Sequence, residues 1–307
     1  MHVICLGELI IDFTSLEPEK PLWKVGKFQK NVGGAPANVA VGLHHHSVDV
    51  SLWSQVGNDS FGEFLIEKIR QIGVDTSGIL IDKNHSTKLA FVGLDRGGDR
   101  YFEFHNAKNS AEQYIAFEKL PLSAFDHARV FHFGGVALLG DVTWETTRKV
   151  LKIAKTNDCI VSFDPNIRID LMKNPDEILA RFRGALKYVD ILKLSEADQS
   201  QFFSGQPPGD ILAAGPSLLM ITVGEKGAHF YTHSQSVGVP AKPVNAVDTT
   251  GAGDAFLAAF LAKFVRVSGQ TRPDALSREQ LETWGKFAGE WAGKIVARRG
   301  AIAGYIR

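Results

Sequence analysis

The chain has 307 residues, with 34 Lys and Arg residues balanced by 34 Asp and Glu residues, so its formal charge is zero. This balance lacks the basic surplus that nucleic-acid binding usually requires, and we expect no nucleic-acid partner. With 44% hydrophobic and 22% charged residues, the composition is that of a globular protein large enough to bury a core, which excludes a disordered or collagen-like chain.

The N-terminal segment predicts neither a targeting signal nor a membrane anchor. Its apolar run is short, has no basic residues before it, and is interrupted by Glu8. No stretch of about 18 consecutive apolar residues occurs, so no helix is expected to span a bilayer. We therefore expect a cytoplasmic protein without a membrane partner. Cys5 and Cys159 lie in apolar stretches and are expected in the core, in preference to a redox or metal role.

Short apolar strands alternate with amphipathic helices along most of the chain. The predicted strands are 3–6, 48–53, 130–133, 160–163, 191–194 and 218–223. The predicted helices include 37–45, 61–72, 144–154, 175–188 and 251–265. This alternation predicts a single α/β domain over 1–307, with a mostly parallel sheet sandwiched by helices, and ligands bound beyond the carboxyl ends of the strands.

Two segments, about 13–31 and 87–106, interrupt this alternation. They alternate apolar and polar residues, and the second contains a hairpin-like Arg-Gly-Gly-Asp at 96–99. Such segments predict a small separate β-sheet. This sheet could be a lid over a substrate, an oligomer contact, or both.

The sequence at 247–256, Val-Asp-Thr-Thr-Gly-Ala-Gly-Asp-Ala-Phe, leads directly into the last of the predicted helices. Small residues leave the backbone N–H groups of its first turn exposed, and such a helix N-terminus attracts an anion such as a phosphoryl group. Asp254 would repel that anion unless it accepts a proton from an attacking hydroxyl group. The alternative is that Asp254 only interacts favourably with the helix dipole.

Two long motifs resemble the signatures of the ribokinase (PfkB) family of sugar and nucleoside kinases. The segment 248–256 is similar to the C-terminal signature, and Asn-Val-Gly-Gly-Ala-Pro-Ala-Asn-Val-Ala-Val-Gly at 31–42 is similar to the N-terminal one. The resemblance covers essentially the whole chain. It implies a Rossmann-like core with a β-sheet lid, and magnesium- and ATP-dependent phosphorylation of a hydroxymethyl group. It also implies that Asp254 is the catalytic base and that the amides of Gly251, Ala252 and Gly253 bind the transferring phosphoryl group.

The residues after the first predicted strand are candidates for sugar binding. Asp12 could accept hydrogen bonds from two hydroxyl groups, Gly33 and Gly34 would allow a sugar to approach the backbone, and the Asn38 amide offers both a donor and an acceptor. The resemblance implies sugar contacts at Asp12, Gly34 and Asn38. A turn followed by a capped helix would explain the glycines alone.

Asp-Pro-Asn-Ile-Arg at 164–168 follows another buried strand. It resembles the corresponding motif of fructokinases and 2-keto-3-deoxygluconate kinases, which implies that Arg168 contacts substrate or phosphate. A solvated arginine is the alternative.

The resemblance also implies nucleotide and cation contacts. The segment Lys193-Leu-Ser195-Glu-Ala-Asp198 resembles one that organises magnesium and phosphate, with Asp198 in place of the usual Glu. A turn containing Thr222, Gly224 and Gly227 resembles the nucleotide-binding turn. Asp248 and Thr250, with the segment 297–301, match a loop that holds a monovalent cation such as K⁺ in relatives.

The favoured reaction is phosphorylation of fructose to fructose 6-phosphate, because several motifs resemble bacterial fructokinases. Ser110-Ala111 is closer to 2-keto-3-deoxygluconate kinases, whose substrate carries a carboxylate that Arg168 could bind, so that activity is the alternative. A ribokinase, a nucleoside kinase and a sugar sensor without turnover are less favoured. The expected partners are a small sugar and ATP, with a homodimer through the lid expected only by analogy.

Overall fold

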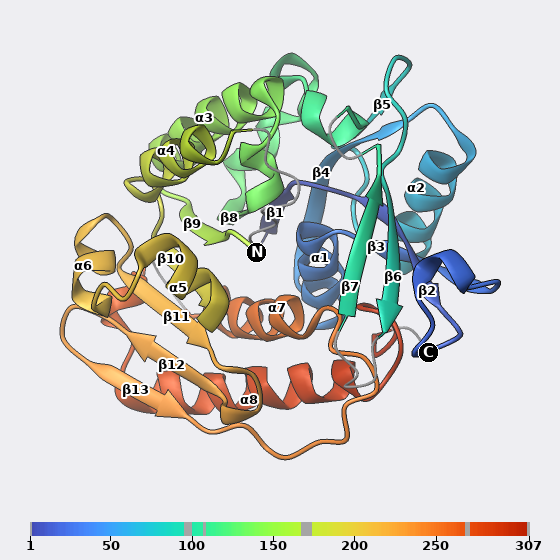
Figure 1. Cartoon of the computed structure of the whole chain (residues 1–307). Coiled ribbons are helices and arrows are strands. Elements are labelled where there is room, and N and C mark those ends of the chain that lie inside the picture. Colours follow the sequence, from blue (N-terminus) through green and yellow to red (C-terminus); the bar gives the residue numbers. More distant parts are fainter. Residues whose placement is uncertain (1, 95–99, 107–108, 167–173, 268–270, 306–307) are drawn as a thin grey trace.

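A central sheet of nine strands forms the middle layer of the protein in a computed structural model, which describes residues 2–94, 100–106, 109–166, 174–267 and 271–305 (Figure 1). In spatial order its strands are β13 (Ser236–Val239), β12 (Ala228–Tyr231), β11 (Leu218–Thr222), β10 (Ile191–Ser195), β9 (Ile160–Asp164), β8 (Ala128–Gly134), β1 (His2–Leu6), β4 (Asp49–Gly57) and β5 (Ile79–Asp82). Pairing is parallel from β11 to β5, and β12 and β13 are added antiparallel at one edge.

All six predicted strands lie in this sheet, as β1, β4, β8, β9, β10 and β11. Strands β5, β12 and β13 were not predicted from the sequence. Each has four residues, and β12 and β13 alternate buried and exposed positions, so they lack the continuous apolar run of a strand covered on both faces.

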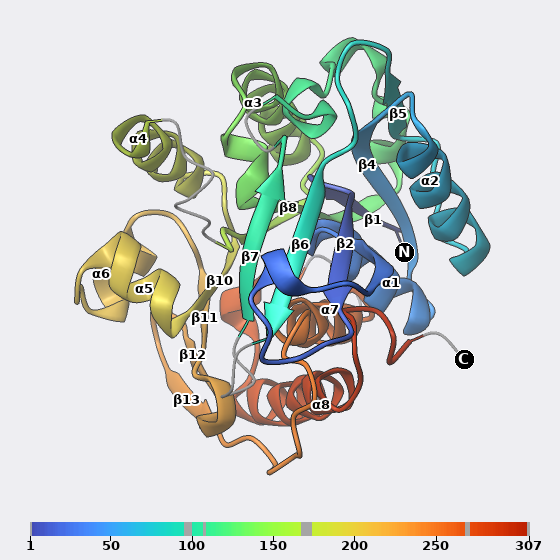
Figure 2. The ribbon, with the colours of Figure 1, turned by 45° about the vertical axis from the view of Figure 1, so that its right-hand side comes forward.

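Helices cover both faces of the sheet, as the two views together show (Figures 1 and 2). One face packs against α1 (Ala35–His45), α2 (Ser60–Ile72), α7 (Ala252–Phe264) and α8 (Arg278–Val296). The other face packs against α3 (Asp141–Thr156), α4 (Pro175–Leu186), α5 (Glu196–Phe203) and α6 (Pro208–Ala213). The short 3-10 helices are η1 (Leu22–Lys24), η2 (Ala111–Tyr114), η3 (Phe117–Lys119), η4 (Leu122–Asp126), η5 (Gly135–Leu138), η7 (Gly224–Lys226) and η8 (Pro273–Ala275).

Helix α8 was not predicted from the sequence, although its signals are local. Ser277 and Gln280 form a reciprocal capping box at its N-terminus. Leu281, Ala288 and Ile295 recur seven residues apart and are buried against α7. The capping motif together with this spacing would have predicted the helix.

The predicted small sheet is present, and it has four strands in the order β3 (Phe28–Gly33), β2 (Ile10–Ser15), β6 (Leu89–Leu94) and β7 (Arg100–His105). Strand β2, the first of the four along the chain, begins at Ile10, three residues before the predicted start of the segment at about 13. Strands β2 and β6 pair in parallel, and the two outer pairs are antiparallel. The predicted turn at 96–99 lies outside the described residues.

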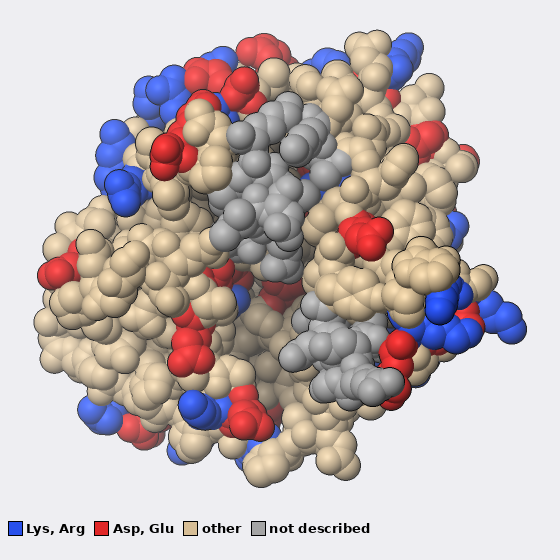
Figure 3. Space-filling view, in the orientation of Figure 1, with Lys and Arg blue, Asp and Glu red and all other residues tan. Residues whose placement is uncertain are grey.

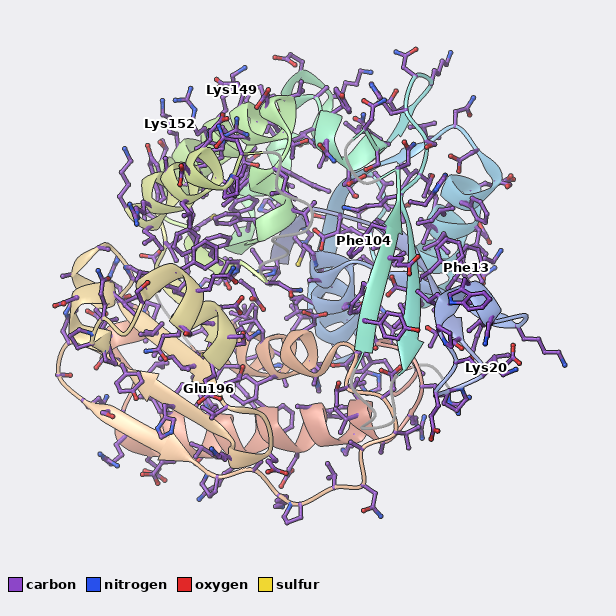
Figure 4. The ribbon with its side chains drawn as sticks, in the orientation of Figure 1. Phe13, Lys20, Phe104, Lys149, Lys152 and Glu196 are labelled. Atoms are coloured by element: carbon purple, nitrogen blue, oxygen red, sulfur yellow. The ribbon has the colours of Figure 1, made fainter. Side chains whose placement is uncertain are left out.

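The two faces of this small sheet carry different aromatic side chains. Phe13 stacks on Phe91 with ring centroids 5.2 Å apart, and Phe28 and Phe61 pack against this pair. Phe104 extends from β7 on the side that faces the core of the protein, opposite Phe13 (Figure 4). The sheet is therefore held to α2 by one face, which leaves the other available to line a site. A dimer through the lid stays a prediction.

The remaining general predictions concern the cysteines and the membrane. Cys5 and Cys159 are both buried and free, as expected for core residues. Over the residues that the structure describes, no helix is both long and apolar enough to cross a membrane.

Candidate active site

A cleft of about 520 Å³ lies between the small sheet and the carboxyl ends of the parallel strands. Its lining includes the N-terminal turns of α1, α5 and α7 and the face of β7 that carries Phe102 and Phe104. In the surface view, acidic side chains lie at the floor of the hollow between the lid strands and the α5 side (Figure 3). Glu196 marks the α5 side of the cleft and Phe104 the lid side (Figure 4).

The first turn of α7 opens into this cleft. Gly251 caps the helix with a φ of 76°, in the left-handed region that glycine adopts without strain. A Cβ atom there would lie 2.8 Å from the backbone of Ala301, so glycine is also required by space. The N–H groups of Gly251 and Gly253 donate no hydrogen bond to described residues, whereas Ala252 N–H donates to the Thr249 carbonyl at 3.3 Å. Two of the three predicted anion-binding amides are therefore unpaired with respect to the residues that the structure describes.

Asp254 lies in the same turn and is 7% exposed. Its Oδ2 atom accepts a hydrogen bond of 2.8 Å from the Asn38 side-chain amide, which comes from α1 and is 216 residues away in the sequence. The other polar atom of that amide, Asn38 Oδ1, is buried without a hydrogen-bond partner among the described residues. The pair thus holds one carboxylate in place and presents an unused acceptor beside it.

A buried cation lies on the other side of this turn. Lys193 Nζ donates to Asp164 Oδ2 at 2.8 Å, and both side chains are almost fully buried. The same Nζ lies so close to Gly253 that a Cβ atom there would be 2.7 Å from it. Lys193 therefore places its ammonium group beside the unpaired amides of α7.

Burial and ion pairing shift the pKa values of Asp164 and Lys193 in opposite directions. Burial raises the pKa of Asp164 to about 6, against the lowering effect of Lys193. Burial alone would lower the pKa of Lys193, but Asp164 and then Asp198 and Asp254 raise it above its ordinary value. Both groups therefore remain charged near neutral pH, because an acid with a pKa of about 6 is then mostly ionised.

Asp12 and the two glycines meet at the start of the small sheet. A Cβ atom on Gly33 would lie 2.3 Å from Asp12 Oδ2, and one on Gly34 would lie 2.2 Å from the carbonyl oxygen of Glu8. Gly34 also has a φ of 108°. Asp12 and Gly34 line the cleft, while Gly33 acts by leaving space for the Asp12 carboxylate.

The predicted nucleotide residues lie at the ends of β10 and β11. Ser195 and Asp198 form the capping box of α5, with Asp198 Oδ2 accepting from Ser195 N at 2.8 Å and Ser195 Oγ at 2.6 Å. Thr222 and Gly224 line the cleft beside them. Gly227 is not among the lining residues. Its φ is 106°, and a Cβ atom there would lie 2.1 Å from the Val239 carbonyl oxygen, so glycine is required for the turn into β12.

Asp248 connects the loop before α7 to the loop after α8 through hydrogen bonds. Its Oδ1 atom accepts from the N–H and hydroxyl groups of Thr250, and its Oδ2 atom accepts from Gly300 N at 2.8 Å. Within the described ranges, no cluster of three His, Cys, Asp or Glu side chains could hold a metal ion. The metal contacts expected of Asp198, Asp248 and Thr250 stay predictions, and Arg168 lies outside the described residues.

Several lining residues were not assigned a role from the sequence. Glu8 and Lys88 are buried charged groups of the cleft, and Phe102 and Phe104 form its apolar side. A lysine directly before the alternating strand at 89–94 was a visible irregularity. That it is buried depends on contacts between distant segments, which no local pattern contains.

The spacing at Gly253 supports a test of the Lys193 position. We expect Gly253→Ala to lower turnover by at least about tenfold, because the new methyl group displaces the ammonium from the α7 turn. The free energy of unfolding should change little, because Nζ is the far end of a flexible side chain. Steady-state kinetics and denaturant unfolding of the same preparation measure both. Unchanged turnover would mean that the position of Lys193 beside Gly253 is unimportant.

The family comparison agrees with the motifs. A family model described as pfkB family carbohydrate kinase matches residues 1–306. Fructokinase-2 of Zea mays is 32% identical over 306 residues, covering 98% of this chain and 90% of the relative.

Solved structures share the whole fold. The uncharacterized sugar kinase PH1459 from Pyrococcus horikoshii, solved in complex with ATP, has a TM-score of 0.84 at 35% identity and covers 98% of this chain and 94% of that one. A fructokinase double mutant from Vibrio cholerae O395, solved with fructose, ADP and a potassium ion, has a TM-score of 0.85 at 26% identity and covers 99% and 94%. The fold is therefore one that carries a sugar and a nucleotide in related proteins.

Proposed function

The chain belongs to the pfkB family of carbohydrate kinases and is a sugar phosphotransferase, and we propose that it transfers the terminal phosphoryl group of ATP to the terminal hydroxymethyl group of fructose. The observation that carries the proposal is the position of Asp254. Its carboxylate is held by Asn38 in the same helix turn that offers unpaired amides to the cleft. A proton acceptor next to an anion-binding turn is the arrangement that phosphoryl transfer to a hydroxyl group requires.

In this proposal Asp254 accepts the proton of the attacking hydroxyl group. The hydrogen bond from Asn38 Nδ2 to Oδ2 holds the carboxylate in a fixed orientation in the cleft, where it receives the proton. Asn38 Oδ1 accepts a hydrogen bond from a neighbouring sugar hydroxyl, which satisfies an atom that is otherwise buried and unpaired. Asp12 accepts from further hydroxyls near the backbone of Gly34.

The negative charge of the phosphoryl group is balanced by the α7 turn and by Lys193. The free N–H groups of Gly251 and Gly253 and the positive end of the helix dipole are fixed before the reaction begins. Lys193 adds a full charge at Gly253, and its pairing with Asp164 limits the movement of that charge. These groups stabilise charge without the reorganisation that water would need.

The nucleotide is proposed to lie along the ends of β10 and β11, against Ser195, Thr222 and Gly224. Magnesium, when it binds with ATP, supplies charge neutralisation on the phosphate oxygens. Because Mg²⁺ keeps several waters and is held largely by phosphates, few protein ligands are needed, and Asp198, which lines the cleft, is the proposed ligand. A potassium ion beside Asp248 and Thr250 is a further part of the proposal.

A sugar panel tests the function. Purified protein with ATP and magnesium is offered fructose, 2-keto-3-deoxygluconate, ribose and a nucleoside, and ADP release is followed for each. The proposal expects the highest kcat/KM with fructose. Preference for 2-keto-3-deoxygluconate would establish the alternative activity, and preference for a nucleoside would exclude both. No ADP with any acceptor would favour a sensor without turnover.

A further inference from the structure

Three buried charged side chains lie close together at the wall of the cleft. Glu8 follows β1, Lys88 precedes β6, and Glu112 lies in η2. Their exposed fractions are 7%, 1% and 2%. Lys88 Nζ lies 3.2 Å from Glu112 Oε1, and Ser110 Oγ donates to the same oxygen at 2.7 Å. Glu8 and Lys88 line the cleft.

Two polar atoms in this group have no hydrogen-bond partner in the described part of the chain. Glu8 Oε1 accepts from Ala35 N at 3.0 Å, but Glu8 Oε2 has no partner among the described residues. Lys88 Nζ makes no hydrogen bond within the same ranges, despite its ion pair with Glu112. A buried acceptor and a buried donor left unsatisfied at the wall of a cleft are costly unless a ligand completes them.

Helix α1 relates this group to the reacting end of the site. Ala35, bonded to Glu8, is its first residue, and Asn38, bonded to Asp254, follows three residues later. At 1.5 Å per residue these two positions are about 4.5 Å apart along the helix axis. A small sugar with one end at Asp254 would therefore bring its other end to Glu8 and Lys88.

Each cation that lines the cleft in the described part of the chain is already paired with a carboxylate. Lys88 is paired with Glu112, and Lys193 with Asp164. Glu8 makes no ion pair with any described residue, so its ionisation adds a negative charge at this part of the cleft wall. An anionic group on the substrate would meet repulsion here, whereas a neutral hydroxyl or carbonyl group would satisfy both free atoms.

We propose that Glu8 and Lys88 are specificity-determining residues that select an uncharged sugar and reject sugar acids. Glu8 Oε2 accepts a hydrogen bond from a hydroxyl at the end of the sugar remote from the transferred phosphoryl group. Lys88 Nζ donates to an oxygen of the same end. The inference rests on the proposed transfer to a sugar hydroxyl, but it concerns selection between sugars and not the transfer itself.

The charge of Glu8 makes this selection depend on pH. Burial raises the pKa of Glu8 to about 7, against the lowering effects of backbone hydrogen bonds and Lys88, while Glu112 raises it further. The titratable groups that face Glu8 are thus Lys88 and Glu112. Above this pKa Glu8 is ionised and repels an anionic sugar, and below it Glu8 is neutral. Selection against sugar acids should therefore strengthen as the pH rises.

The experiment compares fructose with 2-keto-3-deoxygluconate for the full chain and for Glu8→Gln. The variant keeps an acceptor for Ala35 N–H but replaces the free oxygen by a neutral donor. In the unaltered protein, the ratio of kcat/KM for fructose to that for the sugar acid should rise roughly tenfold from about pH 6 to about pH 8. Effects of pH on ATP cancel in this ratio.

In Glu8→Gln the ratio should fall at least about tenfold and lose its pH dependence, with the KM for fructose raised and kcat nearly unchanged. Glu63→Gln, which removes an exposed acid from the first turn of α2, should leave the ratio of the two kcat/KM values and its pH dependence unaltered. The double variant Lys88→Met/Glu112→Gln removes the donor without leaving the Glu112 carboxylate buried without its cation, and it should raise the KM for fructose. Thermal unfolding of each variant checks that it is folded.

An unchanged ratio and slope in Glu8→Gln would overturn this inference while leaving fructose phosphorylation intact. Absence of transfer to either sugar would instead overturn the proposed function. In that event calorimetric binding of the two sugars to the same variants still decides the role of Glu8, because a shift in relative affinity toward the sugar acid supports it and equal shifts contradict it.

Discussion

Asp254→Asn should lower kcat by at least about 100-fold, because the amide cannot accept the proton of the sugar hydroxyl group. The substitution is nearly isosteric, and the new side-chain oxygen can still accept the hydrogen bond from Asn38. Fructose affinity and the free energy of unfolding should therefore change little. Steady-state kinetics, calorimetry of fructose binding and denaturant unfolding measure the three quantities.

The control for this experiment separates proton transfer from the helix dipole. Glu63 is an exposed acid in the first turn of α2, as Asp254 is a buried one in the first turn of α7. Glu63→Gln loses the same charge at a helix N-terminus and should keep full turnover. Near-normal turnover in Asp254→Asn as well would show that this acid only stabilises its helix, and the kinase mechanism above would have to be abandoned.

Lys193→Met is expected to affect both stability and turnover. It leaves the Asp164 carboxylate buried without its cation, which should cost about 3–5 kcal/mol in the free energy of unfolding. It also removes the charge beside Gly253, which should lower kcat by about 100-fold or more. Denaturant unfolding and steady-state kinetics measure the two effects. In this single variant the lower kcat could follow either from the lost charge or from the lost stability.

A double variant makes that separation. Lys193→Met/Asp164→Asn removes both charges and should recover most of the lost stability, because no unpaired carboxylate remains. Its turnover should stay low. As a control away from the cleft, the double variant Lys155→Met/Arg272→Met removes both cations that pair with buried Asp190, directly before β10, and it should cost stability without lowering kcat. Wild-type turnover in the double variant would restrict Lys193 to a structural role.

Most of the fold followed from local sequence signals. Continuous apolar runs identified six of the seven described strands that pair in parallel in the central sheet, because a strand covered on both faces needs apolar side chains at every position. The alternation of apolar and polar residues near 13–31 and 87–106 identified a separate sheet, because successive side chains of a strand point to opposite faces of its sheet. The four-residue strands β5, β12 and β13 lack a continuous apolar run and were not predicted, and α8 was missed despite its capping box.

Many residues of the site could also be named from the sequence. Asp12, Asn38, Ser195 and Asp254 line one cleft because parallel strands bring their carboxyl ends, and the helices that follow, to a single edge of the sheet. Gly227 and Asp248 belong to turns beside the cleft. The sequences around these two residues predict a turn. Such a sequence is compatible both with a turn that contacts a ligand and with a turn that does not.

What depended on the tertiary structure were the partners of the charged groups. The sequence determines that Asp254 stands in a helix turn of small residues, but its contact with Asn38 joins positions 216 residues apart. The pairing of Lys193 with Asp164, and the burial of Glu8, Lys88 and Glu112 together, likewise arise between segments that are distant in the chain. Local patterns report the conformation of neighbouring residues, whereas the charge and hydrogen bonding of a buried group are set by whichever segments the packed core brings against it.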